Sequence, residues 1–215
     1  MDKKIELVKR LKNCGYMRTK KVEKGFLEVD RAIFIPDNLK HFAYHDYPLE
    51  IGFGQTISAP HMVVIMCELL ELEKGQKVLE IGAGSGYHAA MIANIVGKNG
   101  GVYTVENIPA LAEIAAENIK MAGYGDRVHV IVGDGSLGYE EKGPYDAILV
   151  TCAAPQLPDP LKEQLNTKGN IVIPIGSLYL QTLYRFKKSG ENWKREVHGD
   201  VVFVPMRGKF GFHLS

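Results

Sequence analysis

Short apolar runs alternate with amphipathic stretches in the part of the chain that follows residue 76. The runs have the length of buried strands, and most stretches between them carry apolar residues at helical spacing. Proline near the start of a stretch and glycine at its end mark helix boundaries, as at Pro109 and Gly123. The predicted strands are KVLEI, GVYTVE, RVHVIV, YDAILV and NIVIPI, and the predicted helices are SGYHAAMIANIV, PALAEIAAENIKMA and PDPLKEQL.

This order of strands and helices predicts an α/β fold. Strands joined through helices require right-handed crossovers, which produce a doubly wound, mainly parallel sheet. Near the C-terminal end two further apolar runs, LYLQTLYRF and KREVHGDVVFVPM, flank the polar turn KKSGEN. They predict an antiparallel hairpin that completes the sheet as its sixth and seventh strands.

The first 75 residues lack this alternation. Apolar spacing predicts one helix around residues 5–11 and a second around residues 22–29, which Thr19 could cap. A loop rich in aromatic residues and glycine follows, and Pro60 then stands in the first turn of a further helix. We expect a single domain over residues 1–215, with an N-terminal helical segment (1–50), a substrate loop and helix (51–75), a cofactor-binding core (76–176) and a C-terminal hairpin and flap (177–215).

The composition is that of an ordinary globular protein, with 46% apolar residues, 24% charged residues and a net charge of +1. A nucleic-acid-binding protein usually carries a basic surplus, so we expect no nucleic-acid partner. No apolar run approaches the ~20 residues that cross a bilayer. The N-terminal stretch MDKKIELVKRLKNCG is too charged for a secretory signal. We therefore expect a cytoplasmic protein without membrane association, and we expect it to be a monomer.

The three cysteines are Cys14, Cys67 and Cys152. An odd and scattered set argues against a disulfide framework and against a zinc site. We expect reduced thiols, most of them buried.

A glycine-rich turn joins the first predicted strand of the sheet to its helix, in the sequence VLEIGAGSGYHAA. Ligands of doubly wound sheets bind at such turns, beyond the carboxyl ends of the strands. Gly82, Gly84 and Gly86 give the spacing G-x-G-x-G, whereas the dinucleotide fingerprint needs a glycine where Tyr87 stands. The Gly-Lys-Ser/Thr of a P-loop is also missing. The loop therefore argues against a dinucleotide or a nucleoside triphosphate.

Acidic residues at neighbouring strand ends indicate which ligand the loop accepts. Glu106, followed by Asn107, closes the second strand about 20 residues after the loop, where a carboxylate can bind ribose hydroxyls. At the next strand end, Asp134 could accept from an adenine amino group while the N–H of Gly135 donates to the ring. Together these features predict a nucleoside without phosphate, which is the pattern of S-adenosylmethionine.

Glu80, at the end of the first strand, is the fourth member of this acidic set. It could bind near the methionine part of the cofactor, or it could brace the glycine turn. Each feature also has a simpler interpretation on its own. Glu106 could be a solvated strand end, and the sequence GDG could be a plain turn.

The methyl acceptor must be held about 3 Å from the methyl group and opposite the sulfur. Amino-group methylases carry an Asn/Asp-Pro-Pro-aromatic motif after the fourth strand, where this chain has TCAAPQLPDP. That stretch offers only Asp159 as a carboxylate, which is too little for a metal site. A carboxylate acceptor needs neither base nor metal, because it is ionised at neutral pH. No metal is expected.

The segment GFGQTISAPHM supplies groups that could orient a carboxylate. Thr56, Ser58 and His61 cluster at the start of a helix, whose free N–H groups favour an anion. On this segment alone the plainer interpretation has priority, in which Ser58 is an N-cap and His61 a polar residue of the first turn.

Several segments together resemble the protein-L-isoaspartate (D-aspartate) O-methyltransferase family. They are GFGQTISAPHM, LEIGAGSGY, VGDGSLGY, PYDAILVTCAAP, LKEQL with KGNIVIPIG, and FVPMRGKFGF, in that order.

The resemblance implies the fold of class I S-adenosylmethionine-dependent methyltransferases, with a seven-stranded sheet. It also implies methylation of the free α-carboxylate of L-isoaspartyl residues in proteins and peptides, with S-adenosyl-L-homocysteine as the product and repair through a succinimide. By resemblance Ser58 is the active-site serine, Gln55, Thr56 and His61 approach cofactor or substrate, and residues 205–212 form a flap over the substrate groove.

Three other functions stay open at this point. They are another class I methyltransferase, such as a tRNA adenine-N1 or small-molecule enzyme, a nucleoside-binding module without catalysis, and an NAD-linked oxidoreductase. The missing basic surplus argues against a tRNA methylase. The intact set of Ser58, Glu106 and Asp134 argues against a module without catalysis, and Tyr87 argues against an NAD-linked enzyme.

Overall fold

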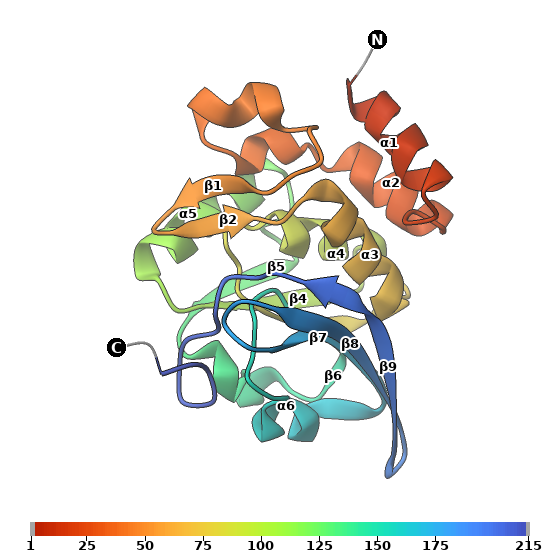
Figure 1. The fold of residues 1–215 in the computed structure, drawn as a ribbon, viewed down its shortest axis with the longest axis vertical. Coiled ribbons are helices and arrows are strands. Elements are labelled where there is room, and N and C mark those ends of the chain that lie inside the picture. The colour runs from red at the N-terminus through yellow and green to blue at the C-terminus, as the bar shows by residue number, and fades with distance from the viewer. Residues whose placement is uncertain (1–2, 214–215) are drawn as a thin grey trace.

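The computed structural model describes residues 3–213, which form a seven-stranded sheet between two layers of helices (Figure 1). The strand order is β5-β4-β3-β6-β7-β8-β9, and β3 to β7 run parallel, while β8 is antiparallel to both of its neighbours. This confirms the predicted doubly wound sheet with a C-terminal hairpin. The strands are β3 (Lys77–Ile81), β4 (Gly101–Glu106), β5 (Val128–Val132), β6 (Tyr145–Val150), β7 (Leu165–Gly176), β8 (Gln181–Ser189) and β9 (Asn192–Val201).

The strand order reverses at β3, because the chain first builds outward to β4 and β5 and then returns to place β6 on the other side. In open α/β sheets the ligand crevice lies at such a reversal, beyond the carboxyl ends of the strands. The glycine-rich turn follows β3 directly, so the topology places it at this point.

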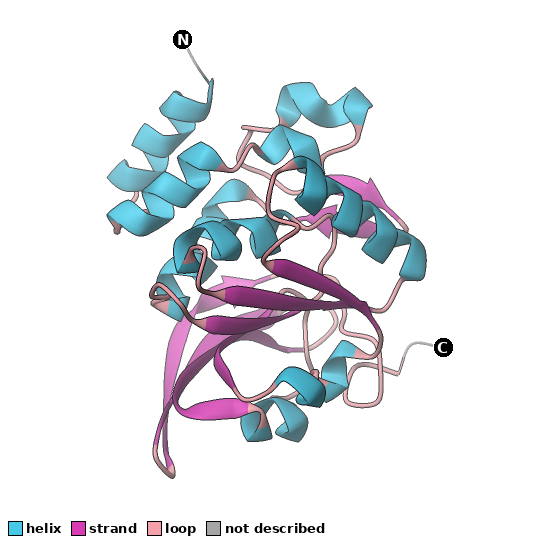
Figure 2. Cartoon of the chain, turned by 180° about the vertical axis from the view of Figure 1, so that it is seen from behind, coloured by secondary structure: helices cyan, strands magenta, loops and turns pink. Residues whose placement is uncertain are grey.

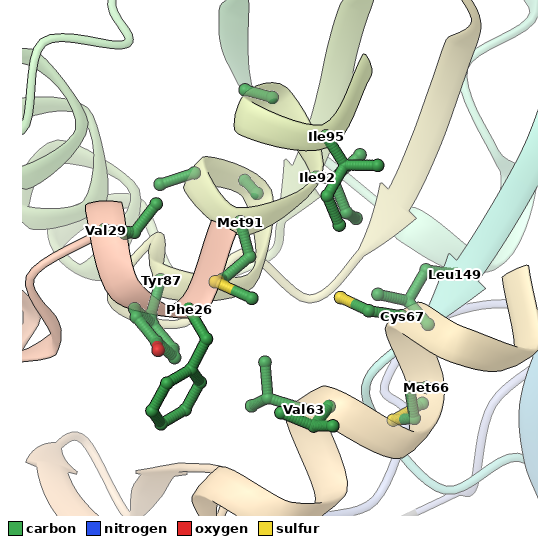
Figure 3. Close-up of a cluster of buried hydrophobic side chains, with 14 of the residues drawn as sticks. Phe26, Val29, Val63, Met66, Cys67, Tyr87, Met91, Ile92, Ile95 and Leu149 are labelled. Atoms are coloured by element: carbon green, nitrogen blue, oxygen red, sulfur yellow. The ribbon is translucent and has the colours of Figure 1, made fainter. Parts of the chain in front are cut away.

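Helices cover both faces of the sheet (Figure 2). α3 (Pro60–Leu70), α4 (Tyr87–Val96) and α5 (Pro109–Met121) pack on one face, and the shorter α6 (Asp159–Glu163) lies on the other with the 3₁₀ turns η3 (Gly135–Leu137) and η4 (Glu140–Lys142). Each face has its own apolar core. Figure 3 shows side chains of the larger core converging between helices, among them Phe26, Met91 and Cys67.

The N-terminal segment consists of α1 (Lys3–Asn13), α2 (Lys20–Glu28), η1 (Arg31–Phe34) and η2 (Asp37–Phe42). The side chain of Thr19 caps α2 by accepting a hydrogen bond from the backbone N–H of Val22, as predicted. α2 packs on α4 and thereby fixes the N-terminal segment against the core.

Three local predictions were wrong. The expected loop before α3 contains a hairpin of β1 (Leu49–Gly52) and β2 (Gln55–Ile57), whose turn places Phe53 and Gly54 at φ 54° and 68°. Positive φ at both central residues matches the right-handed twist of hairpin strands. β7 begins at Leu165 rather than at the predicted Asn170, which shortens α6. β9 ends at Val201, and the following residues leave the sheet to form a bridge between Pro205 and Ala153.

Within residues 3–213, no helix has the length and apolar character that a membrane span requires. The same residues contain no group of three or more His, Cys, Asp or Glu side chains placed to hold a metal ion. The three cysteines are free thiols, with Cys67 and Cys152 buried and Cys14 exposed.

Candidate active site

A cavity of about 830 Å³, partly open to solvent, lies at the carboxyl ends of β3, β4 and β6. Its lining combines the strand ends with segments that are far away in the sequence. The lining residues are 55–58, 63, 81–85, 87–88, 105–107, 111, 135, 151–152 and 204–207. We call the part of the lining that carries the glycine loop and Glu106 the cofactor end, and the part that carries Ser58 the acceptor end.

The glycine loop needs its glycines for conformation and for space. Gly82, Gly84 and Gly86 have φ values of 95°, 54° and 93°, which side chains rarely adopt. A Cβ on Gly82 would lie 2.5 Å from Oγ1 of Thr151, whose hydroxyl donates to the carbonyls of Ile81 and Gly82. Gly82 and Gly84 line the cavity, as predicted for cofactor-binding residues.

Gly86 was also predicted to bind the cofactor, but it lies beneath the loop and outside the cavity lining. It is the N-terminal cap residue of α4, and a Cβ there would come within 2.9 Å of Ile119 on α5. Its role in the structure is the close packing of α4 against α5.

Glu106 is buried at the end of β4, and backbone N–H groups hold its carboxylate. Oε2 accepts from Gly84 at 3.0 Å, and Oε1 accepts from Asn107 at 3.0 Å and from Ile108 at 3.1 Å. The interpretation of Glu106 as a solvated strand end is therefore wrong. A carboxylate offers about four lone-pair sites, so one remains for a ribose hydroxyl.

Glu80 lies deeper, fully buried and outside the cavity lining. Its Oε2 accepts from the hydroxyl of Thr104 at 2.6 Å, while Oε1 has no partner in the protein. Burial, helped by the nearby charge of Glu106 and opposed by the hydrogen bond from Thr104, raises the pKa of Glu80 to about 8. Glu80 is therefore protonated at neutral pH, and it is bonded to β4 rather than to the glycine turn.

Asp134 caps η3, and its carboxylate is occupied by the chain itself. Oδ1 accepts from the backbone N–H and hydroxyl of Ser136, and Oδ2 accepts from the backbone N–H of Lys209 at 2.8 Å. A Cβ on Gly208 would lie 1.9 Å from Asp134, so the C-terminal segment can approach this closely only through a glycine. Gly135 lines the cavity as predicted, whereas Asp134 does not.

Ser58 lines the acceptor end together with Gln55 and Thr56. The N-terminal cap of α3 is Ala59, so the interpretation of Ser58 as the cap is wrong. The backbone carbonyl of Ser58 accepts a hydrogen bond of 2.8 Å from Nη2 of Arg31 on η1. This bond ties Ser58 to the N-terminal segment through its backbone, so it does not occupy the side-chain hydroxyl.

His61 does not line the cavity, so its position does not support the predicted contact with the cofactor. Both its backbone N–H and its ring Nδ1 lie 2.8 Å from Oδ1 of Asp46, which also forms an ion pair with Arg10. Burial works to raise the pKa of Asp46, but the hydrogen bonds from His61 outweigh it and lower that pKa below its usual value.

Several lining residues escaped the sequence analysis. His88 follows Tyr87 at the start of α4, and burial lowers its pKa to about 3, so its imidazole is neutral; Nε2 lies 3.3 Å from Sγ of Cys67. Thr151 and Cys152 had a weak signal, since they directly follow the fourth strand of the sheet. Residues 204–207 include Pro205, which forms a β-bridge with Ala153. This bridge brings the C-terminal segment to the cavity.

The cofactor end fits a nucleoside that carries no phosphate. It offers a carboxylate held by N–H groups, a loop with little bulk, and the apolar side chains of Ile81, Val105 and Leu111. An anionic phosphate beside Glu106 would be repelled, whereas hydroxyl groups can donate to it.

Known proteins are similar to this chain over nearly its whole length. Residues 2–211 match the model of the family described as protein-L-isoaspartate(D-aspartate) O-methyltransferase. The chain is 54% identical over 215 residues to the protein-L-isoaspartate O-methyltransferase of Hyperthermus butylicus (96% of this chain, 89% of that protein). It is 51% identical over 207 residues to that of Methanopyrus kandleri (96% and 92%).

Solved structures of the same type are also similar. A protein-L-isoaspartate O-methyltransferase superposes with a TM-score of 0.87 at 31% identity, covering 97% of this chain and 67% of that one. A Plasmodium falciparum protein assigned to this type, solved with S-adenosyl-L-homocysteine, gives a TM-score of 0.83 at 30% identity and covers 94% and 97%.

Proposed function

The chain belongs to the protein-L-isoaspartate(D-aspartate) O-methyltransferase family, and we propose that this cavity is where it methylates the free α-carboxylate of L-isoaspartyl residues in damaged proteins. S-adenosyl-L-methionine is the methyl donor, and S-adenosyl-L-homocysteine is the product. The methyl ester starts repair, because it is a better leaving group from which a succinimide forms. The observation that carries the proposal is the continuity of one cavity from Glu106 to Ser58.

We propose that the residues of the cofactor end bind the donor. When bound, the donor supplies an electrophilic methyl group on its sulfonium. Glu106 accepts from ribose hydroxyls, and Asn107 and Gly135 flank the nucleoside. Gly82 and Gly84 leave the space in which the donor approaches the backbone, and Gln55 and Thr56 contact it from the opposite wall. The hydrogen bonds from N–H groups to Glu106 support this role, because they fix its carboxylate before binding.

Ser58 orients the acceptor carboxylate rather than attacking as a nucleophile. A nucleophilic serine needs a base that takes its proton. In the described part of the chain no group accepts from the Ser58 hydroxyl, and His88 is a weak base because its pKa lies near 3. The carboxylate is ionised at neutral pH and needs only hydrogen-bond donors and exclusion of water. Residues 204–207 line the cavity and supply part of that exclusion.

The test uses radiolabelled S-adenosyl-L-methionine and two peptides that differ only in Asp or isoAsp at one position. We expect label to enter the isoAsp peptide and to be released by base, as methyl esters are. Equal labelling of both peptides, or labelling of neither, contradicts the proposal. A Ser58→Ala variant that is folded and binds the cofactor serves as the control for background transfer.

We also propose that the chain is a single domain, active as a monomer in the cytoplasm, without a nucleic-acid partner. The net charge of +1 supports the absence of a nucleic-acid partner, and the single seven-stranded sheet shared by both apolar cores supports one domain. Sedimentation of the protein at several concentrations tests the oligomeric state.

A further inference from the structure

Arg31 is the largest charged side chain that the core encloses. It is 0% exposed, and within the described residues its side chain donates one hydrogen bond, from Nη2 to the Ser58 carbonyl. Its guanidinium lies 5.0 Å from the ring centroid of Tyr87. Nε and Nη1 have no partner in the protein. Among residues 3–213 no carboxylate forms an ion pair with Arg31.

This arrangement leaves a buried positive charge without a direct ion pair among the described residues, and the charge of Asp46 acts on it only from a distance. Burial lowers the pKa of Arg31 to about 10, so the side chain remains charged at neutral pH. A buried charge is costly unless it is paired and hydrogen-bonded, and an arginine fork offers five donors. Arg31 does not line the cavity itself, so its charge acts through the wall and favours an anion bound in the cavity.

The position of Arg31 indicates which anion this is. Its two contacts, Ser58 and Tyr87, both line the cavity, and its charge also lowers the pKa of His88 in the same wall. Arg31 thus lies directly behind the acceptor end. The carboxylate of Glu106 forms no ion pair with Arg31, because three backbone N–H groups hold it.

We propose that Arg31 is a positioning residue that selects the ionised acceptor carboxylate. It acts in two ways, by fixing the Ser58 backbone so that its hydroxyl faces the cavity and by attracting the negative charge of the acceptor through the cavity wall. The inference rests on the proposed function, which it deepens. Methylation converts the carboxylate into a neutral ester, so the attraction holds the substrate and is lost in the product.

Transition-state reasoning separates the two effects. The reaction neutralises the acceptor charge, so a fixed positive charge stabilises the bound substrate at least as much as the transition state and acts on KM. Anchoring Ser58 acts on kcat, because it sets the geometry of the reacting carboxylate. Replacing the charge and replacing the anchor should therefore change different kinetic constants.

The experiment compares two peptides, one with an isoaspartyl carboxylate and one with the isosteric α-carboxamide. Titration calorimetry measures the affinity of each peptide for protein saturated with S-adenosyl-L-homocysteine. In the wild type we expect the carboxylate to bind about tenfold more tightly. Arg31→Met should reduce this ratio to about one, and Arg31→Lys should keep most of it while lowering kcat. Arg127→Met, which removes a half-buried arginine just before β5 and outside the cavity lining, should change neither.

The outcomes are distinct. An unchanged ratio in folded Arg31→Met overturns the inference, and so does a wild type that binds both peptides equally. A weaker affinity for S-adenosyl-L-homocysteine with an unchanged peptide ratio also overturns it, since Arg31 would then serve the cofactor. If Arg31→Met does not fold, two measurements still test the inference. They are the ratio of carboxylate to carboxamide affinity in the wild type, and whether Arg31→Lys lowers kcat while it keeps most of that ratio. Failure of the proposed function appears separately, as wild-type protein that does not methylate the isoAsp peptide.

Discussion

The cofactor end of the cavity is built from adjacent strand tips, whereas the acceptor end is built from segments far apart along the chain. At the cofactor end, the sheet register alone brings Gly84 beside Glu106, because β3 and β4 are paired neighbours. At the acceptor end, a hydrogen bond from Arg31 of the N-terminal segment holds Ser58, and residues 204–207 of the C-terminal segment line the same cavity.

The difference shows which kind of contact each end depends on. A strand pair fixes its tips through many backbone hydrogen bonds, so single side-chain changes there should act on ligand binding or on stability. The acceptor end depends on a few side-chain contacts between distant elements, so changes there should act on turnover while cofactor binding persists. Substitutions at the two ends test this division.

The largest effect is expected from Glu80→Gln, which tests whether a neutral acid lies beneath the cofactor end. The pKa of Glu80 is about 8 in the folded protein and returns to 4.5 in the unfolded chain. Between these values only the folded state keeps the proton, so the free energy of unfolding falls by about 1.4 kcal/mol for each pH unit of increase. Glutamine cannot ionise, and the variant should be about 3 kcal/mol more stable than the wild type at pH 7.

Urea unfolding at pH 5, 6, 7 and 8 measures this difference. His88, with a pKa near 3 in the folded state against 6.5, lowers stability in acid in both proteins and therefore cancels in the comparison. Glu140→Gln, at an exposed position, is the matched control. A stability difference that does not grow with pH would mean that Glu80 is ionised in the folded protein.

Gly82→Ala should have the next largest effect, and it acts on the cofactor end directly. Its φ of 95° is strained for alanine, and the new Cβ would displace the Thr151 hydroxyl. We expect the affinity for S-adenosyl-L-homocysteine to fall about 100-fold, which corresponds to about 3 kcal/mol. Gly75→Ala has a similar φ of 85° but meets no atom within 4 Å, so it should show the backbone strain without the loss of affinity. Equal losses in both variants, measured by calorimetry, contradict this explanation.

Ser58→Ala tests the acceptor end. Removing one donor that orients the reacting group should lower kcat about 100-fold, while the cofactor affinity stays within about twofold of the wild type. Stability should be unchanged, because Ala59 and not Ser58 caps α3. Thr19→Ala is the matched control, because Thr19 is the N-cap of α2. It should lower the free energy of unfolding by about 1 kcal/mol and leave kcat unchanged. A loss of cofactor affinity in Ser58→Ala would break the division between the two ends.

The same division explains how far the sequence could predict the site. Glu106 and the glycine loop were predictable because strand order determines which tips become neighbours. The long-range partner of Asp134 was not predictable in this way, because it is the backbone of Lys209, which a separate crossing of the C-terminal segment brings there.

Residues of the acceptor end gave still weaker signals. Arg31 and Ser58 are 27 residues apart, and no periodic pattern connects them, so only the folded chain shows their contact. The β1–β2 hairpin escaped prediction because its strands are very short and its turn holds Phe53 at a positive φ, which sequence rules assign to glycine or asparagine.

Glu106→Ala should weaken cofactor binding by about 2 kcal/mol, or about 30-fold, the range for a charge-assisted hydrogen bond. The loss also releases the N–H groups of Gly84, Asn107 and Ile108, so kcat at saturating cofactor should fall less than the affinity does. Glu113→Ala, on the exposed side of α5, should leave binding unchanged. Calorimetry with S-adenosyl-L-homocysteine measures the affinity, and an unchanged value would remove Glu106 from the site.

His61→Ala should have the smallest effect, although the residue belongs to the same motif as Ser58. Its side chain pairs with Asp46 near the surface, and such pairs contribute less than about 1 kcal/mol. We expect kcat and cofactor affinity within about twofold of the wild type. Because the pKa of Asp46 is lowered in the folded protein, its ionised form stabilises the fold at pH values above the pKa of the unfolded chain. This stabilisation is lost in acid, so any loss of stability in His61→Ala should shrink towards low pH. A tenfold weaker cofactor affinity would contradict this expectation. It would mean that His61 contacts the cofactor, as its place in the motif predicts, although it does not line the cavity in the structure.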